Sequence, residues 1–199
     1  MQKEGKKIVI GIDQSYTRTG YAVCVDGKIE EHGSLSPLNK EETHIRLRAR
    51  LKLCVSNIIN KYLTKYTNPD IMIITERDNS KHRLVIKNSA ELTSLIADVA
   101  YFRNIPTYSV VATAWKSKVI PKKYGKPSDY ETERKPNKMP QIMFCEKELG
   151  IDLKEYDKKG NIKLDKEGRM WYIDDIADAV GIALYGFVDS KLQKLQKEE

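Results

Sequence analysis

The sequence is poor in the residues from which disulfide frameworks and zinc sites are built. Its 199 residues include three cysteines and three histidines, and no Cys-x-x-Cys pair occurs. Cys24, Cys54 and Cys145 are odd in number and far apart, which predicts three reduced and mostly buried thiols. The scarcity of sulfur and imidazole ligands argues against a zinc site and against a disulfide-stabilised secreted scaffold.

Long apolar runs are also missing. No run approaches the roughly 18 to 20 residues that are needed to cross a bilayer. The first seven residues, MQKEGKK, lead directly into a short strand pattern rather than into the apolar centre of a signal peptide. We therefore expect a cytoplasmic protein that does not bind membranes.

The chain does have ordinary size, a globular composition and a surplus of positive charge. Its length fits a single domain, 1–199, and 40% hydrophobic against 32% charged residues is a balance typical of folded proteins. The 35 basic and 28 acidic residues give a net charge of +7. A basic surplus of this kind points to a polyanionic partner, and its distribution along the chain is more informative than its total.

The apolar patterning predicts an α/β fold with a mixed sheet. Strand patterns over 7–13, 20–25 and 28–35, with an Asp26-Gly27 hairpin signal, predict an antiparallel three-strand meander. Two more apolar strand runs alternate with helices, and Asn88 resembles a helix cap. These later strands cover 71–75 and 105–111, and the helices cover about 42–65, 88–103, 113–116, 137–149 and a long stretch from 174. The order predicts a five-stranded sheet with helices on both faces.

Carboxylates stand where these elements end or begin. Asp13 and Glu76 end two predicted central strands, and in open α/β sheets the functional crevice lies outside the carboxyl ends of the strands. Asp175 and Asp178 are three residues apart and share one face of the last helix. Each acid alone has an ordinary explanation, such as a turn, an ion pair or a favourable position near a helix N-terminus. Together they predict a site for hard divalent cations, in which two ions roughly 3.5 to 4 Å apart would clamp a phosphodiester during hydrolysis.

Four segments in register resemble the RuvC-type Holliday-junction resolvases of the RNase H-like superfamily. They are IGIDQSYTRTGYAV at 10–23, IMIITE at 71–76, KNSA at 87–90 and DIADAVGIA at 175–183. The resemblance implies a homodimeric, metal-dependent endodeoxyribonuclease that cuts four-way DNA junctions with two Mg²⁺ or Mn²⁺ ions per active site. It also implies a metal-binding catalytic set, which is Asp13, Glu76, Asp175 and Asp178, and two assisting lysines, which are Lys116 and Lys138.

The chain departs from the pattern of that family at three places. Gln14-Ser15 stands where the family usually has Pro-Gly, the segment 114–137 is longer than usual, and 150–172 looks like an insertion. In these respects the chain resembles the divergent resolvases of phages and mobile elements, which act in the bacterial host cell. The departures bear on the preferred cleavage sequence and on selectivity for four-way junctions.

Basic residues gather in two segments. The loop 116–138 contains eight basic residues and three acids with interleaved aromatics, and a second basic segment follows Glu76. Lysines suit phosphate contacts and aromatic rings stack on unpaired bases, although solvated surface loops are the alternative. The predicted DNA-binding residues are Lys81, His82, Arg83, Lys87, Trp115, Lys116, Lys118, Lys122, Lys123, Tyr124, Lys126, Arg134, Lys135 and Lys138.

Other functional classes fit parts of the same pattern. An actin-like ATP-binding protein also opens with a Gly-Ile-Asp strand, but it needs two such domains and a second glycine-rich phosphate loop, which this sequence does not contain. A junction-binding dimer that does not cut DNA would gain nothing from clustered carboxylates that face DNA. Among nucleases, a broader branched-DNA enzyme that cuts forks and flaps, or an RNase H, is also compatible with the acids.

Overall fold

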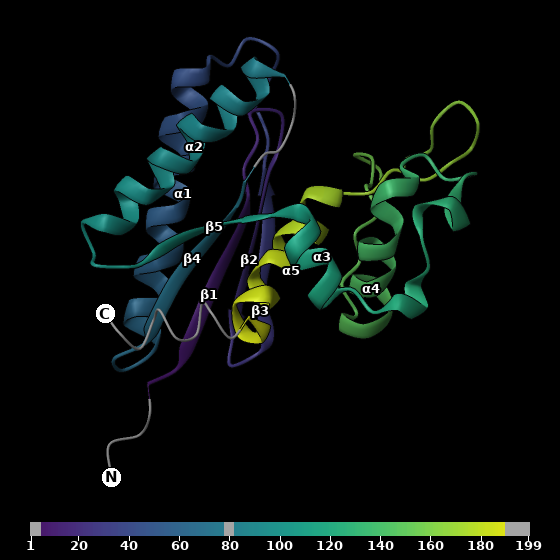
Figure 1. Ribbon diagram of the computed structural model, residues 1–199. Coiled ribbons are helices and arrows are strands. Elements are labelled where there is room, and N and C mark those ends of the chain that lie inside the picture. The colour runs from purple at the N-terminus through teal and green to yellow at the C-terminus, as the bar shows by residue number, and fades with distance from the viewer. Residues whose placement is uncertain (1–4, 78–81, 190–199) are drawn as a thin grey trace.

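A five-stranded sheet forms the centre of the computed structural model, which describes residues 5–77 and 82–189 (Figure 1). The strands are β1 (Lys7–Asp13), β2 (Thr19–Val25), β3 (Lys28–Leu35), β4 (Asp70–Arg77) and β5 (Thr107–Val111). Their order is β3-β2-β1-β4-β5, with β1, β2 and β3 antiparallel and with β4 parallel to both β1 and β5. The predicted mixed sheet with an antiparallel meander first is thus confirmed.

Helices cover both faces of this sheet, as predicted (Figure 1). They are α1 (His44–Lys65), α2 (Arg83–Tyr101), α3 (Ala112–Val119), α4 (Met139–Leu149) and α5 (Asp174–Val188). Alternate residues of β1 point into opposite cores: Ile8 and Ile10 pack under α1 and α2, whereas Val9 packs with Trp115 and with Ile182 of α5. The central strands are apolar on both faces because both faces are covered.

Two glycines allow α5 to lie unusually close to the strands. A Cβ atom on Gly11 of β1 would lie 2.4 Å from the carbonyl oxygen of Ala179. A Cβ atom on Gly20 of β2 would lie 2.0 Å from the carbonyl oxygen of Asp175. Any side chain at these positions would push the helix away. The glycines therefore bring the first turns of α5 onto the carboxyl end of β1.

The start of α2 differs from the prediction. The helix begins at Arg83 with His82 as its N-cap residue, so Asn88 lies inside the helix and the predicted cap there is wrong. The additional first turn carries Leu84, Val85 and Ile86, all of which are exposed. Because their side chains do not face the core, this turn lacks the periodic burial from which the helix was predicted.

The segment between α3 and α4 is built from short turns, in line with the irregular structure predicted there. It contains three 3₁₀ turns, which are η1 (Lys122–Tyr124), η2 (Pro127–Tyr130) and η3 (Pro136–Lys138). The three cysteines are unpaired, as predicted, and burial raises the pKa of the Cys24 and Cys145 thiols to about 12. In the part of the chain that the structure describes, no helix combines the length and the apolar character that spanning a bilayer requires.

The predicted insertion 150–172 contains a short internal repeat. Residues 157–161 read DKKGN and residues 165–169 read DKEGR. In both, the aspartate carboxylate accepts hydrogen bonds from two backbone amides of the turn, and the glycine has a positive φ, 83° at Gly160 and 79° at Gly168. The segment therefore contains two copies of one tight turn.

Candidate active site

Four acidic side chains meet at the carboxyl edge of the sheet. Because Ile12 of β1 pairs with Thr75 of β4, the next residues, Asp13 and Glu76, extend from neighbouring strands. The first two turns of α5 bring Asp175 and Asp178 to the same edge. Burial, and then repulsion by Asp178 and Glu76, raise the pKa of Asp13 well above its ordinary value. Asp13, Glu76, Asp175 and Asp178 therefore form one carboxylate cluster.

Asp178 is the most buried member of the cluster and is neutralised from α4. The Lys138 ammonium forms an ion pair with one carboxylate oxygen, and Gln141 Nε2 donates to the other at 2.9 Å. Burial works against the charge on Lys138, but attraction to Asp178 and Asp13 outweighs it and raises the lysine pKa above its ordinary value. Lys138 thus provides a positive charge between two of the acids.

The neighbouring acids at the start of α5 have separate partners. The buried Asp174 forms an ion pair with Lys135 at 2.6 Å, and Nζ of Lys138 lies 4.0 Å from the other carboxylate oxygen of Asp174. Asp175 is more exposed and lies 3.9 Å from Nε of Arg18. Burial, and then repulsion by Asp174, raise the pKa of Asp175. The sequence pattern singled out Asp175 and Asp178, and the structure places Asp174 beside them as an ion-paired neighbour.

Glu76 is held by the indole of Trp115. Nε1 of Trp115 donates to Oε2 of Glu76 at 2.8 Å, and the ring is wholly buried against Gly181 of α5. Burial raises the pKa of Glu76, and the indole hydrogen bond opposes that shift. The prediction that Trp115 stacks on DNA bases is therefore wrong, because no face of its ring reaches the surface. Lys116 lies close by, with its Nζ 5.2 Å from the centroid of the Trp115 ring.

Gln14 is a site residue whose role the sequence did not indicate. Its Nε2 lies 2.5 Å from the Glu76 carbonyl oxygen and 3.0 Å from the hydroxyls of both Ser89 and Thr93. The side chain thereby joins the end of β1 to the end of β4 and to α2. A cavity of about 340 Å³ opens beside it, lined by Asp13, Gln14, Ser15, Tyr16, Thr17, Val85, Asn88, Ser89 and Leu92. The Gln14-Ser15 departure from the family pattern therefore lies next to the cluster.

The chemistry of the cluster fits hard divalent cations. Carboxylate oxygens are the ligands that Mg²⁺ and Mn²⁺ prefer, and a cation would relieve the repulsion that acts on Asp13. Among the described residues, no donor contacts the Asp13 carboxylate, and no three His, Cys, Asp or Glu side chains are arranged as they would be around a metal ion. The other acids point instead to Lys138, Trp115 and Arg18.

The predicted basic loop 116–138 divides into two parts. Lys135 and Lys138 lie at the cluster, whereas Lys123 forms an ion pair with Glu148 in the last turn of α4. With 11 residues, α4 is about 16 Å long, so these two groups of lysines lie at opposite ends of the helix. Tyr124 donates to the same Glu148 at 2.5 Å. Lys122 and Lys126 are exposed beside them, and their role in DNA binding stays a prediction.

The other predicted DNA-binding residues lie on three different elements. Lys118 forms an ion pair with Asp189 at 2.5 Å. The Arg134 guanidinium stacks on Trp171 of the 150–172 segment, 3.3 Å from the ring centroid. His82, Arg83 and Lys87 are exposed at the start of α2, and Lys81 lies outside the described residues.

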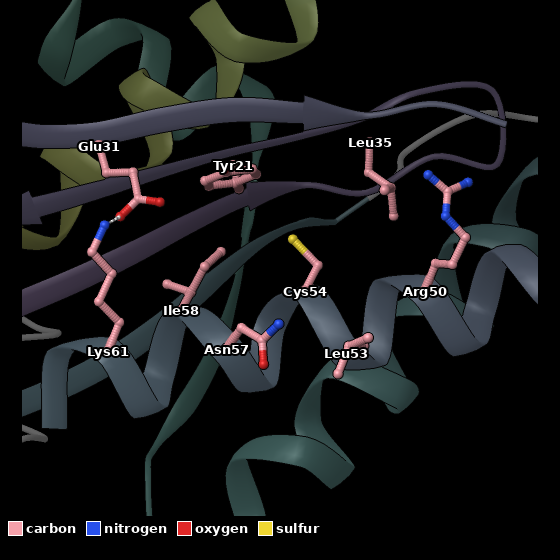
Figure 2. Close-up of a pocket in the computed structure, with 9 residues that line it drawn as sticks. All are labelled: Tyr21, Glu31, Leu35, Arg50, Leu53, Cys54, Asn57, Ile58 and Lys61. Atoms are coloured by element: carbon pink, nitrogen blue, oxygen red, sulfur yellow. Dashed lines mark hydrogen bonds and ion pairs between the residues drawn. The ribbon is translucent and has the colours of Figure 1, made fainter. Parts of the chain in front are cut away.

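A second cavity lies between α1 and the strands β2 and β3. Its volume is about 380 Å³, and Figure 2 shows its residues projecting from β2, β3 and α1. Lys61 forms an ion pair with Glu31 at 2.7 Å at one end, and the Cys54 thiol points towards the strands. No member of the carboxylate cluster lines this cavity, and we do not assign the candidate reaction to it.

Comparison with known proteins shows which fold carries this site. No family model and no curated protein matches the sequence. The structure is similar to Thermus thermophilus RuvC in complex with a Holliday junction substrate, with a TM-score of 0.60 and 12% identity over 94% of this chain and 96% of that chain. A second structure of T. thermophilus RuvC gives a TM-score of 0.59 and 13% identity over the same shares, 94% and 96%. The chain therefore has a RuvC-like fold, as its motifs predicted.

Proposed function

We propose that this protein is a metal-dependent endodeoxyribonuclease that resolves four-way DNA junctions. The observation that carries the proposal is the gathering of Asp13, Glu76, Asp175 and Asp178 at one edge of a RuvC-like sheet. A cluster of carboxylates repels DNA unless cations neutralise it, so its position on this fold favours metal-assisted hydrolysis over simple binding. One solved structure with this fold is that of T. thermophilus RuvC in complex with a Holliday junction substrate.

The four acids are the residues that would hold two Mg²⁺ or Mn²⁺ ions. When bound, such ions activate the attacking water and stabilise the leaving oxygen of the phosphodiester. The surrounding side chains hold the cluster in place: Trp115 fixes the Glu76 carboxylate, and Gln14 fixes the main chain of Glu76. Hydrolysis of this kind does not require a covalent nucleophile from the protein.

Lysines at the rim of the cluster favour a phosphate-containing substrate. Lys138 and Lys135 approach from α4 and the turn before it, and Lys116 approaches from α3 beside Glu76. On the opposite side, Arg83 and Lys87 are exposed in the first turns of α2. Positive groups on two sides of the acids would position a DNA backbone across them.

A homodimer suits this reaction. Resolution of a four-way junction needs two cuts related by two-fold symmetry, and a two-fold dimer presents two equivalent sites. The groove between α1 and α2 offers charges of both signs for such an interface, with Arg48 and Lys52 on α1 and Glu91 and Asp98 on α2. Analytical ultracentrifugation with and without a junction tests this part of the proposal.

The decisive experiment is cleavage of a labelled four-way junction beside a matched linear duplex, with Mg²⁺, Mn²⁺ or EDTA. We expect paired, metal-dependent nicks in the junction, and none from Asp13→Asn or Glu76→Gln although both variants still bind it. The matched control is Glu41→Gln, which removes an exposed acid from the turn before α1 and should cut normally. Cutting of forks and flaps at equal rates would establish a broader branch nuclease, and tight binding without cutting would contradict the proposal.

A further inference from the structure

Arg18 lies beside the carboxylate cluster without belonging to it. It is in the turn between β1 and β2, and its Nε lies 3.9 Å from Asp175 Oδ2 and donates to Ser36 Oγ at 3.2 Å. Its Nη1 forms an ion pair with Glu155 of the 150–172 segment. About 30% of the Arg18 side chain is exposed, so the guanidinium lies at the surface of the site.

Glu155 is a buried anchor for this arginine. Its side chain is 8% exposed, and besides Arg18 it pairs with Lys163 at 3.0 Å. Burial alone would raise the Glu155 pKa, but hydrogen bonds from Arg18 and Lys163 lower it below the ordinary value. Because a buried carboxylate without partners is costly, Glu155 constrains the position of the arginine that neutralises it.

The backbone of the 150–172 segment makes this anchor rigid. The amide of Glu155 donates to the Trp171 carbonyl at 2.8 Å, the amide of Lys163 donates to the Glu155 carbonyl at 2.8 Å, and the amide of Trp171 donates to the Lys163 carbonyl at 3.0 Å. These three residues, spaced eight apart, close a ring of hydrogen bonds. Glu155 is a member of that ring, so it is held by a cross-linked frame rather than by a mobile loop.

One edge of the guanidinium stays available. Among the described residues, no acceptor takes a hydrogen bond from Nη2 of Arg18, whereas Nη1 and Nε are both engaged. A guanidinium is a planar fork with five N–H donors, and phosphate oxygens suit its geometry. The guanidinium as a whole lies near Asp175, where the proposed reaction would take place.

We propose that Arg18 binds a DNA phosphate at or next to the bond that is cut, and that Glu155 of the inserted segment positions it for this contact. The inference rests on the proposed function for the identity of the polyanion. It gives the inserted segment a role, because the segment supplies the residue that orients a phosphate ligand beside the cluster.

The test combines Arg18→Gln with junctions in which single phosphates near the branch point are replaced by uncharged methylphosphonates. Binding is measured in Ca²⁺ or EDTA, so that cleavage is not needed. Removing one charge-assisted contact should weaken binding on the order of tenfold and reduce the salt slope by roughly 0.9. One methylphosphonate position should weaken the wild-type protein by a similar factor and leave Arg18→Gln unaffected.

Two further variants separate positioning from charge. Glu155→Gln should weaken binding less than Arg18→Gln does and should lose sensitivity to the same methylphosphonate, while Arg18→Lys should recover part of the affinity. Arg169→Gln is the control, because it removes a cation that pairs with Asp165 in the same segment. Circular dichroism and thermal denaturation verify that each variant is folded.

The outcomes separate this inference from the proposed function. If the wild-type protein cuts junctions and Arg18→Gln responds to every methylphosphonate as the wild type does, the Arg18 assignment is overturned and the nuclease proposal stands. If the wild-type protein binds without cutting and Arg18 shows the expected coupling, the assignment is supported and the nuclease proposal fails. If the wild-type protein binds no DNA, both are wrong.

Discussion

Removing the charge of Asp13 should stabilise the metal-free protein while it abolishes cutting. The Asp13 carboxylate is desolvated and repelled by Asp178, Glu76 and Asp175, with Lys138 as the opposing charge. Asn has nearly the same shape as Asp and carries no charge. The substitution Asp13→Asn should therefore remove a net unfavourable interaction from the folded state without leaving a void.

The magnitude follows from general scales. Changes at buried charged sites are typically on the order of 1 to 3 kcal/mol. For a domain of this size, a free-energy change of 1 kcal/mol shifts the melting temperature by roughly 2 to 4 °C. We thus expect Asp13→Asn to melt roughly 2 to 12 °C above the wild-type protein in EDTA.

The pH dependence gives the sign of the effect. A carboxyl whose pKa is higher in the folded chain binds protons more tightly when folded, so stability falls as the pH rises from the unfolded pKa to the folded pKa. The advantage of Asp13→Asn should therefore be complete above the raised pKa and should vanish below the ordinary value of 3.8, where the carboxyl is protonated in both the folded and the unfolded chain.

Thermal denaturation at several pH values, in EDTA and in Mg²⁺, measures this difference. Metal should stabilise the wild-type protein more than the variant, because an ion that binds the folded state raises its stability by mass action. The control Glu41→Gln, at an exposed position, should change the free energy of unfolding by no more than about 0.5 kcal/mol. If Asp13→Asn is the less stable protein in EDTA at neutral pH, the reasoning about repulsion in the cluster is refuted.

Three further substitutions test the supports of the cluster. Lys138→Gln leaves the buried Asp178 without its ion pair, so the free energy of unfolding of the metal-free protein should fall by about 1 to 3 kcal/mol. Mg²⁺ should then stabilise the variant more than it stabilises the wild-type protein, and equal responses to Mg²⁺ would contradict this. Trp115→Phe keeps an aromatic ring in the core but removes the hydrogen bond to Glu76 and leaves a small void. Cleavage should fall roughly tenfold or more in steady-state assays, with a stability loss of about 1 to 3 kcal/mol. Gly20→Ala places a Cβ 2.0 Å from the α5 backbone, so the free energy of unfolding measured in urea should fall by roughly 1 to 3 kcal/mol. The affinity for Mn²⁺, measured by calorimetry, should also fall. If neither quantity changes, α5 can move to make room for the side chain.

Much of the sheet could be predicted because its signals are local. The strand patterns over 7–13 and 28–35 coincide with β1 and β3, and Asp26-Gly27 forms the predicted hairpin turn with positive φ angles of 47° and 83°. The parallel neighbours β1 and β4 also follow from local signals, because strands covered on both faces are apolar throughout. Acids at two such strand ends could then be placed at one edge.

The parts that escaped prediction depend on contacts between distant segments. Tryptophan is a residue type that stacks on bases, but the partners of Trp115 are Glu76 and Gly181, which are 39 and 66 positions away in the chain. The ring of hydrogen bonds around Glu155 leaves no periodic signal in the sequence, because it joins residues that are 8 and 16 positions apart. Gln14 likewise acquires its role from Ser89, which α2 brings to it.

The close contact between α5 and the strands fixes the acidic side of the site, whereas its basic side can adjust. With Gly11 and Gly20 in backbone contact with α5, the helix cannot slide or rotate without collision, so the positions of Asp175 and Asp178 relative to β1 are settled when the protein folds. The ammonium group of Lys138, by contrast, is carried on a long side chain. When a substrate binds, this cation should move to accommodate it, while the carboxylates of α5 keep the positions that they had before binding.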